Sequence, residues 1–68
     1  MSFKDKQEFD TLEKDLENLE LRKVELTAKL SDIALSSDEL MLAGRDLSEV
    51  ITSIDDKTNR WLELSELA

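Results

Sequence analysis

The stretch that decides the fold is Ile33-Ala34-Leu35-Ser36-Ser37-Asp38-Glu39-Leu40. A long run with leucines at helical spacing precedes it, and a second run of nearly equal length follows it. If the chain turns at an elbow within this stretch, the two runs can pack together as a helical hairpin. If it does not turn, the chain forms one long rod that needs another chain to cover its apolar side.

The run before the elbow has the repeat of a coiled-coil helix. Its apolar residues recur at alternating steps of three and four, which is the a and d pattern of a heptad. Ser2 stands where a residue that caps a helix is expected. We therefore expect a helix over residues 3–33, roughly 45 Å long. The a and d positions form the seam, the side of the helix that would face the other helix. Its eight positions are Phe9, Leu12, Leu16, Leu19, Lys23, Leu26, Leu30 and Ile33.

The run after the elbow repeats this pattern. Ser36 or Ser37 can cap the second helix, and the two acids that follow suit its first turn, where they interact favourably with the helix dipole. Gly44 would lie at the flank of the seam, where a small residue lets the other helix approach. We expect an elbow at residues 34–37 and a helix at 38–66. The eight seam positions are Leu40, Ala43, Leu47, Val50, Ile54, Lys57, Trp61 and Leu64.

The repeat and the charges both favour the hairpin over the rod. A heptad frame that continues unbroken through the elbow gives one good apolar residue in five at the a positions of the second run. A frame restarted at Leu40 makes seven of the eight seam positions apolar. In a parallel dimer of the first helix, acids would also face acids across the seam. The predicted fold class is therefore all-α, a two-helix antiparallel coiled coil.

A hairpin with its turn centred on Ser36–Ser37 sets the register of the two helices. Its flanking charge pairs are attractive, and each exposed pair contributes roughly 0.2–1 kcal/mol, so their main effect is to select the register. The expected contacts are Leu12 with Trp61, Ile33 with Leu40, Asp15 with Arg60 and Lys29 with Asp46.

Composition limits the class of protein. The chain has 68 residues, enough for one small domain, which we place at residues 1–68. Its net charge is −8, and an acidic chain is at a disadvantage in binding phosphate. No apolar run approaches the roughly 20 residues of a membrane span, and the first residues are too charged for a secretory signal peptide. We expect a soluble, cytoplasmic chain and an isolated monomer.

The sequence predicts no catalytic, cofactor-binding or metal site. It has no His and no Cys, which removes most zinc sites and the His-based triads. A single Gly cannot form a glycine-rich phosphate loop. The carboxylates occupy outer helix positions, and no spacing among them matches a calcium loop. We expect a non-catalytic chain.

Three groups of residues could contact other molecules. Leu21, Val24 and Ala28 form a minor apolar stripe on the outside of the first helix, either as ordinary surface or as a contact with another domain. Bases toward the end of the hairpin away from the elbow, and bases in the half nearer the elbow, either keep the chain soluble or contact phosphate. Trp61, the only tryptophan, is expected to be a structural aromatic of the seam rather than a platform for bases.

The two ends of the chain resemble a known family. Ser2-Phe3-Lys4-Asp5-Lys6-Gln7-Glu8-Phe9 resembles an opening of the type Leu-Ser-Tyr-Lys-Glu-Gln-Arg-Glu-Leu. Asn59-Arg60-Trp61-Leu62-Glu63-Leu64 resembles an ending of the type Tyr-Glu-Arg-Trp-Glu-Glu-Leu. These motifs flank the C-terminal coiled-coil domain of ABC-F ATPases of the Uup type, and the leucine pattern and the elbow position agree with that domain.

The resemblance implies a module excised from the C-terminus of a larger, soluble ATPase, after two ATP-binding cassettes. ATP and Mg would bind the missing cassettes, and this chain would bind no cofactor. The implied partner is nucleic acid, either DNA or ribosomal RNA and the ribosome surface. The basic positions that match are Lys4, Lys6 and Arg60. We add Arg22 and Lys29, which share an edge of the first helix.

Two functions of another class stay open. One is a protein-interaction coiled coil that docks onto the cassettes of the parent ATPase through Leu21, Val24 and Ala28. The other is a self-associating rod without a ligand.

Overall fold

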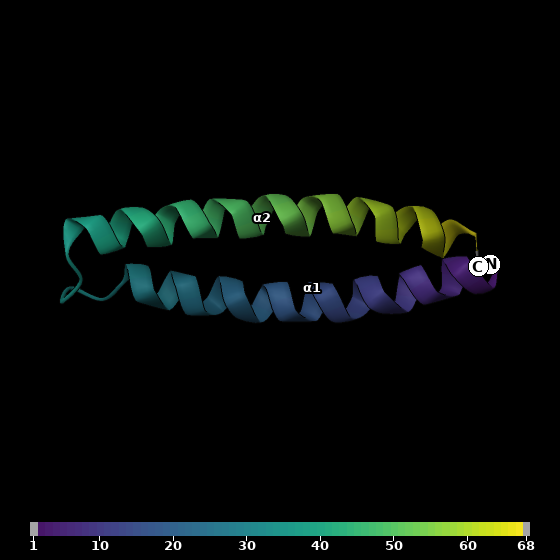
Figure 1. Ribbon diagram of the computed structural model, residues 1–68, viewed down its shortest axis with the longest axis horizontal. Coiled ribbons are helices and arrows are strands. Elements are labelled where there is room, and N and C mark those ends of the chain that lie inside the picture. The colour runs from purple at the N-terminus through teal and green to yellow at the C-terminus, as the bar shows by residue number, and fades with distance from the viewer. Residues whose placement is uncertain (1, 68) are drawn as a thin grey trace.

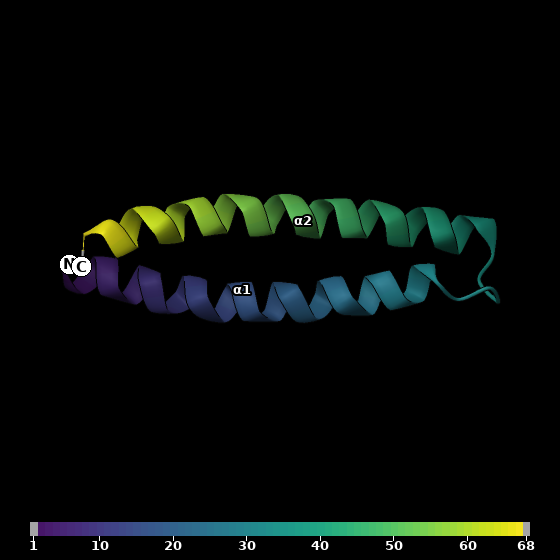
Figure 2. The same ribbon diagram turned by 180° about the vertical axis from the view of Figure 1, so that it is seen from behind.

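The computed structural model describes residues 2–67, which form two antiparallel helices joined by one loop (Figure 1). Helix α1 spans Phe3–Leu30 and helix α2 spans Ser37–Glu66. The hairpin measures 49 × 14 × 14 Å. The start of α1 and the end of α2 lie at the same end, which we call the open end, and the loop lies at the other (Figure 2). The all-α hairpin is confirmed, and the unbroken rod is wrong.

A serine caps each helix. Ser2 Oγ accepts a hydrogen bond from the backbone N–H of Asp5, and Ser36 Oγ accepts one from that of Glu39, each at 3.2 Å. These bonds satisfy backbone donors that have no partner inside the first turn of a helix. The cap expected at Ser36 or Ser37 is therefore Ser36, and α2 begins directly after it.

Helix α1 ends at Leu30 instead of continuing to residue 33. Asp32 ends it, because its carboxylate Oδ1 accepts a hydrogen bond from the backbone N–H of Ala34 at 2.9 Å. Short polar side chains that bind the local backbone in this way compete with helix formation. The resulting turn leaves Ile33 completely exposed, at 102%. The predicted layer of Ile33 with Leu40 is therefore wrong, and the loop covers residues 31–36.

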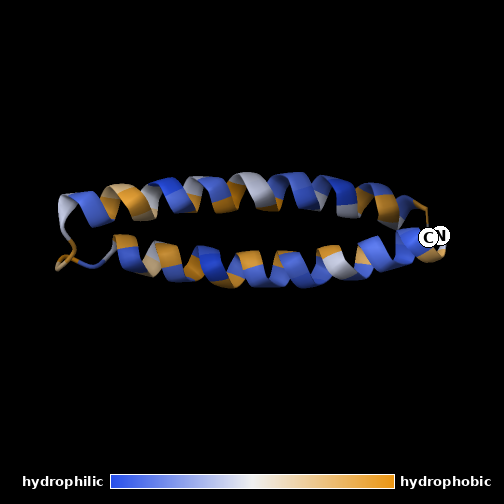
Figure 3. Ribbon diagram, viewed as in Figure 1, coloured by the Kyte–Doolittle hydropathy of each residue, from blue (hydrophilic) through white to orange (hydrophobic). Residues whose placement is uncertain are grey.

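The seam between the helices is thin. Leu12, Leu26, Ala43 and Leu64 are buried, with at most 7% exposure. The other predicted seam residues, apart from Ile33, are half-buried. The hydrophobic parts of the two ribbons lie largely on facing sides (Figure 3). Two helices cannot enclose a thick core. Each buried side chain is therefore covered by residues of both helices.

The flanking pairs differ from the predicted ones, and in each pair the partner on α1 lies seven residues nearer the start of the chain. The physical reason is the early end of α1, which moves the centre of the turn toward the start of the chain. The pairs formed are Arg60 with Glu8 and Arg22 with Asp46, in place of Arg60 with Asp15 and Lys29 with Asp46.

The aromatic contact at the open end lies one layer nearer the start of the chain than predicted. Trp61 stacks on Phe9, with ring centroids 5.4 Å apart and planes 22° apart. Its indole N–H donates to Glu13 Oε1 at 3.4 Å. Trp61 is therefore a structural aromatic with a polar partner, as a half-buried indole requires.

Gly44 does not permit a close approach of the helices. A Cβ atom added to Gly44 would meet no atom within 4 Å, and its backbone has no positive φ. The packing role expected for this glycine is wrong. It lies in the interior of α2, two turns after the start of the helix, in open space, where glycine is an unfavourable helix residue.

Gly44→Ala should stabilise the hairpin. Ala favours a helix interior by about 1 kcal/mol over Gly, which raises the Tm of a domain of this size by about 4–8 °C. Thermal unfolding followed by circular dichroism measures the change. Ala28→Gly, at an exposed helical position of α1, is the matched control and should lower the Tm by a similar amount. An unchanged or lower Tm for Gly44→Ala would contradict the open space beside Gly44.

Candidate functional site

The five bases predicted to contact nucleic acid do not form one patch. Lys4, Lys6 and Arg60 lie at the open end, whereas Arg22 and Lys29 lie in the half of α1 nearer the loop. Along the axis of α1, Lys6 and Arg22 are roughly 24 Å apart. A ligand that contacted all five would have to extend along the hairpin.

Arg60 is bound within the hairpin. Its Nε and Nη2 donate to the two carboxylate oxygens of Glu8 at 2.7 and 2.9 Å, and its Nη1 donates to Glu63 at 3.0 Å. Paired hydrogen bonds between a guanidinium and a carboxylate are among the strongest in proteins. A phosphate group could recruit Arg60 only by displacing these carboxylates.

The same contact shifts the acidity of Glu8. The hydrogen bond from Arg60, together with its charge, holds the pKa of Glu8 below its ordinary value of 4.5. The two carboxylates in turn raise the pKa of Arg60. Both groups therefore stay charged at neutral pH, and the pair ties the end of α2 to the start of α1.

The remaining arginines and the bases of α2 are also paired. Arg22 lies 3.4 Å from Glu25 and 4.0 Å from Asp46 but is still half exposed. On α2, Arg45 lies 3.6 Å from Glu49, and Lys57 lies 3.2 Å from Asp15. These long or exposed pairs are weaker than the contacts of Arg60.

All bases without an ion-pair partner among residues 2–67 belong to α1. On α2, Lys57 and Arg60 pair with acids of α1, and Arg45 pairs with Glu49 of its own helix. The five unpaired bases are Lys4, Lys6, Lys14, Lys23 and Lys29.

Four of the bases of α1 lie on one side of it, in a surface that we call the basic row. Its members are all exposed, and at 3.6 residues per turn they fall within roughly a quarter of the helix circumference. The row contains four bases, three neutral polar residues and one acid, in a chain with 17 acids. The members are Lys4, Gln7, Thr11, Lys14, Asn18, Arg22, Glu25 and Lys29.

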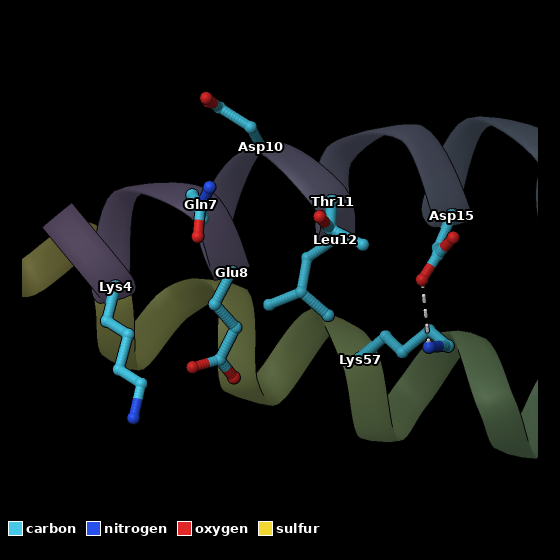
Figure 4. A pocket seen from close by; sticks show the side chains of 8 residues that line it. All are labelled: Lys4, Gln7, Glu8, Asp10, Thr11, Leu12, Asp15 and Lys57. Atoms are coloured by element: carbon cyan, nitrogen blue, oxygen red, sulfur yellow. Dashed lines mark hydrogen bonds and ion pairs between the residues drawn. The ribbon is translucent and has the colours of Figure 1, made fainter.

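The cross-helix ion pairs neutralise two acids beside the basic row. Glu8 and Asp15 lie between the row and the seam, and they accept from Arg60 and Lys57 of α2. Figure 4 shows this part of the molecule, with Lys57 reaching Asp15 along the hollow beside Leu12. Bases of α2 thus offset the negative charge next to the row.

Three predicted residues belong to the basic row, and two do not. Lys4, Arg22 and Lys29 are members, whereas Lys6 lies on another side of α1 and Arg60 serves Glu8. The sequence prediction missed Lys14. The step of three and four residues that identified the seam would have found the row, had it been applied to the polar positions.

The apolar stripe on α1 is exposed, as predicted. Leu21 is 59% and Val24 is 66% exposed. Ala28 and Val24 line a shallow hollow on α1 with Glu20 and Thr27. Within residues 2–67, no three acidic side chains are grouped so that they could hold a metal ion.

The comparisons with known proteins give one family. The family model of the ABC transporter C-terminal domain matches residues 1–66. Searches of curated proteins and of solved structures found no match. Neither helix of the described part is long and apolar enough to cross a membrane.

The Glu8–Arg60 pair should make part of the stability depend on pH. Because the folded pKa of Glu8 lies below 4.5, the pair stabilises the hairpin at neutral pH, and this contribution is lost as the pH falls through the folded pKa. Glu8→Gln should therefore lower the Tm at about pH 7, with a smaller difference from wild type at about pH 3.

Glu17→Gln is the matched control, because Glu17 is exposed and has no ion-pair partner among the described residues. Its Tm difference from wild type should be small at both pH values. A Tm difference for Glu8→Gln that does not change with pH would contradict the role of the pair.

Proposed function

This chain belongs to the ABC transporter C-terminal domain family, and we propose that it is a non-catalytic arm of an ABC-F ATP-binding protein of the Uup type that contacts nucleic acid. The target is DNA or the RNA of the ribosome. ATP and Mg bind the cassettes of the parent ATPase, and the arm supplies contacts with the target in the cytoplasm.

The basic row is the observation that supports contact with nucleic acid. Phosphate binding gains free energy when Lys and Arg displace condensed counterions, and Gln, Asn and Thr also bind phosphate and sugar oxygens. The row carries these residue types and a single acid. From Lys4 to Lys29 it is roughly 37 Å long, close to one turn of B-DNA at about 34 Å.

The net charge of −8 limits this contact. The rest of the surface repels phosphate, so binding has to use the row and has to be weak and salt-dependent. The paired acids beside the row support such a local contact, because the positive charges of Arg60 and Lys57 offset the negative charges of Glu8 and Asp15 where phosphate would approach.

Fluorescence anisotropy with duplex DNA, single strands and a structured RNA, over a salt series, tests the proposal. We expect affinity to fall with salt, with a log–log slope no steeper than about 4, because each of four phosphates contributes about 0.9. Lys14→Glu should weaken binding to all three and reduce the slope by about 1 or more.

Arg45→Glu is the matched control, because it makes the same change of charge at an exposed position of α2 away from the row. It should alter binding less than Lys14→Glu. Absence of binding at low salt, or equal effects of the two substitutions, would overturn the proposal.

The apolar stripe supports a second candidate, docking of the arm onto the cassettes of the parent ATPase. Leu21 and Val24 are exposed on the same helix as the row, and exposed apolar stripes mark contacts between domains. Leu21→Ser with Val24→Ser should leave the Tm of the chain nearly unchanged, because exposed substitutions alter stability by about 0.5 kcal/mol or less.

The same double substitution should weaken binding of the chain to separately produced cassettes, measured by calorimetry. The matched control is Thr52→Ala, at an exposed position of α2. Unchanged binding of the double variant would exclude docking through the stripe.

A further inference from the structure

The loop end of the hairpin has a surface chemistry different from that of the basic row. Three aliphatic side chains are exposed there, Ile33 at 102%, Met41 at 74% and Leu42 at 60%. Figure 3 shows hydrophobic colour at the tip of the loop and in the second turn of α2. Exposed aliphatic side chains are ordinary when scattered, but these three lie within ten residues of sequence at one end of a rod.

The turn holds these side chains in fixed positions. Asp32 binds the backbone N–H of Ala34 at 2.9 Å and its carbonyl accepts from Leu35 at 3.4 Å, while Ser36 caps α2. Leu35 turns inward and is half-buried. The loop therefore leaves Ile33 exposed, while Leu35, two residues later, is half-buried.

The net charge around the aliphatic side chains is negative, since residues 29–42 contain three acids and one base, Lys29. Asp32, Asp38 and Glu39 are exposed at this end, and none has an ion-pair partner among the described residues. Like charges repel, so this surface disfavours phosphate and anionic lipid. It complements a surface that is apolar in the middle and basic at its rim.

We propose that the loop end, formed by Ile33, Met41 and Leu42 with Asp32, Asp38 and Glu39, is a docking element for a protein whose surface has an apolar recess surrounded by Lys and Arg. Burial of the aliphatic side chains supplies affinity, and the acids select the cationic partner and accelerate its encounter. This contact uses none of the residues of the basic row, so it does not depend on the proposed contact with nucleic acid.

A defined probe tests this chemistry. An amphipathic peptide of Leu and Lys, with a Ser and Lys peptide of equal charge as its control, is titrated into the ¹⁵N-labelled chain and followed by NMR. The Leu and Lys peptide should shift the amide signals of residues 31–42 and bind more tightly than its control. Ile33→Ser and Met41→Ser should each lower its affinity about tenfold, since a buried aliphatic side chain contributes about that much.

Leu62→Ser is the matched control, an aliphatic residue 48% exposed near the open end of the hairpin, and should leave this affinity unchanged. Four results would overturn the proposal: absence of binding, equal binding of the two peptides, signal shifts spread along the hairpin, or unaltered affinity of Ile33→Ser. Duplex DNA or anionic phospholipid vesicles that shift the signals of residues 31–42 would also overturn it, in favour of a nucleic acid or a membrane.

Discussion

The hydrogen bond from the Ala34 backbone to the Asp32 carboxylate, at 2.9 Å, is the constraint on which the rest of the structure depends. It ends α1 at Leu30 and so fixes where the chain reverses. Each helical residue advances the same distance along the axis. The position of the turn therefore decides which residue of α2 lies opposite each residue of α1. Arg60 and Glu8 each lie about 24 residues along the chain from the turn, and their meeting follows from this local bond.

The register in turn decides which charges are free. A turn three residues later would have placed Arg60 beside Asp15 instead of Glu8, and Asp46 beside Lys29 instead of Arg22. In the structure Lys29 has no ion-pair partner among the described residues and stays in the basic row, while Glu8 and Asp15 are neutralised. An exposed pair stabilises a fold by less than about 1 kcal/mol, so these contacts affect the electrostatics of the surface more than its stability.

The sequence was sufficient for the two helices, their caps and their antiparallel packing, because heptad spacing and capping serines are strong local signals. It was not sufficient for the register. The heptad repeat continues to Ile33, whereas the helix ends before Asp32, which binds the Ala34 backbone. Whether the helix continues or Asp32 ends it depends on the relative free energies of the two conformations, which residue spacing does not reveal. The role of Gly44 failed for a related reason, since the open space beside it depends on how α1 lies.

The candidate site was predictable only in part. Matching Lys6 and Arg60 to basic positions of a family motif identified bases, but their use depends on partners across the seam, and Arg60 is held by Glu8 and Glu63. The structure instead places basic and acidic surfaces on different parts of one hairpin. Bases are unpaired on one side of α1, while acids and exposed aliphatic side chains occupy the loop end. These two surfaces share no residues. The net charge of −8 therefore weakens contact of the basic row with nucleic acid, while it strengthens contact of the loop end with a cationic protein.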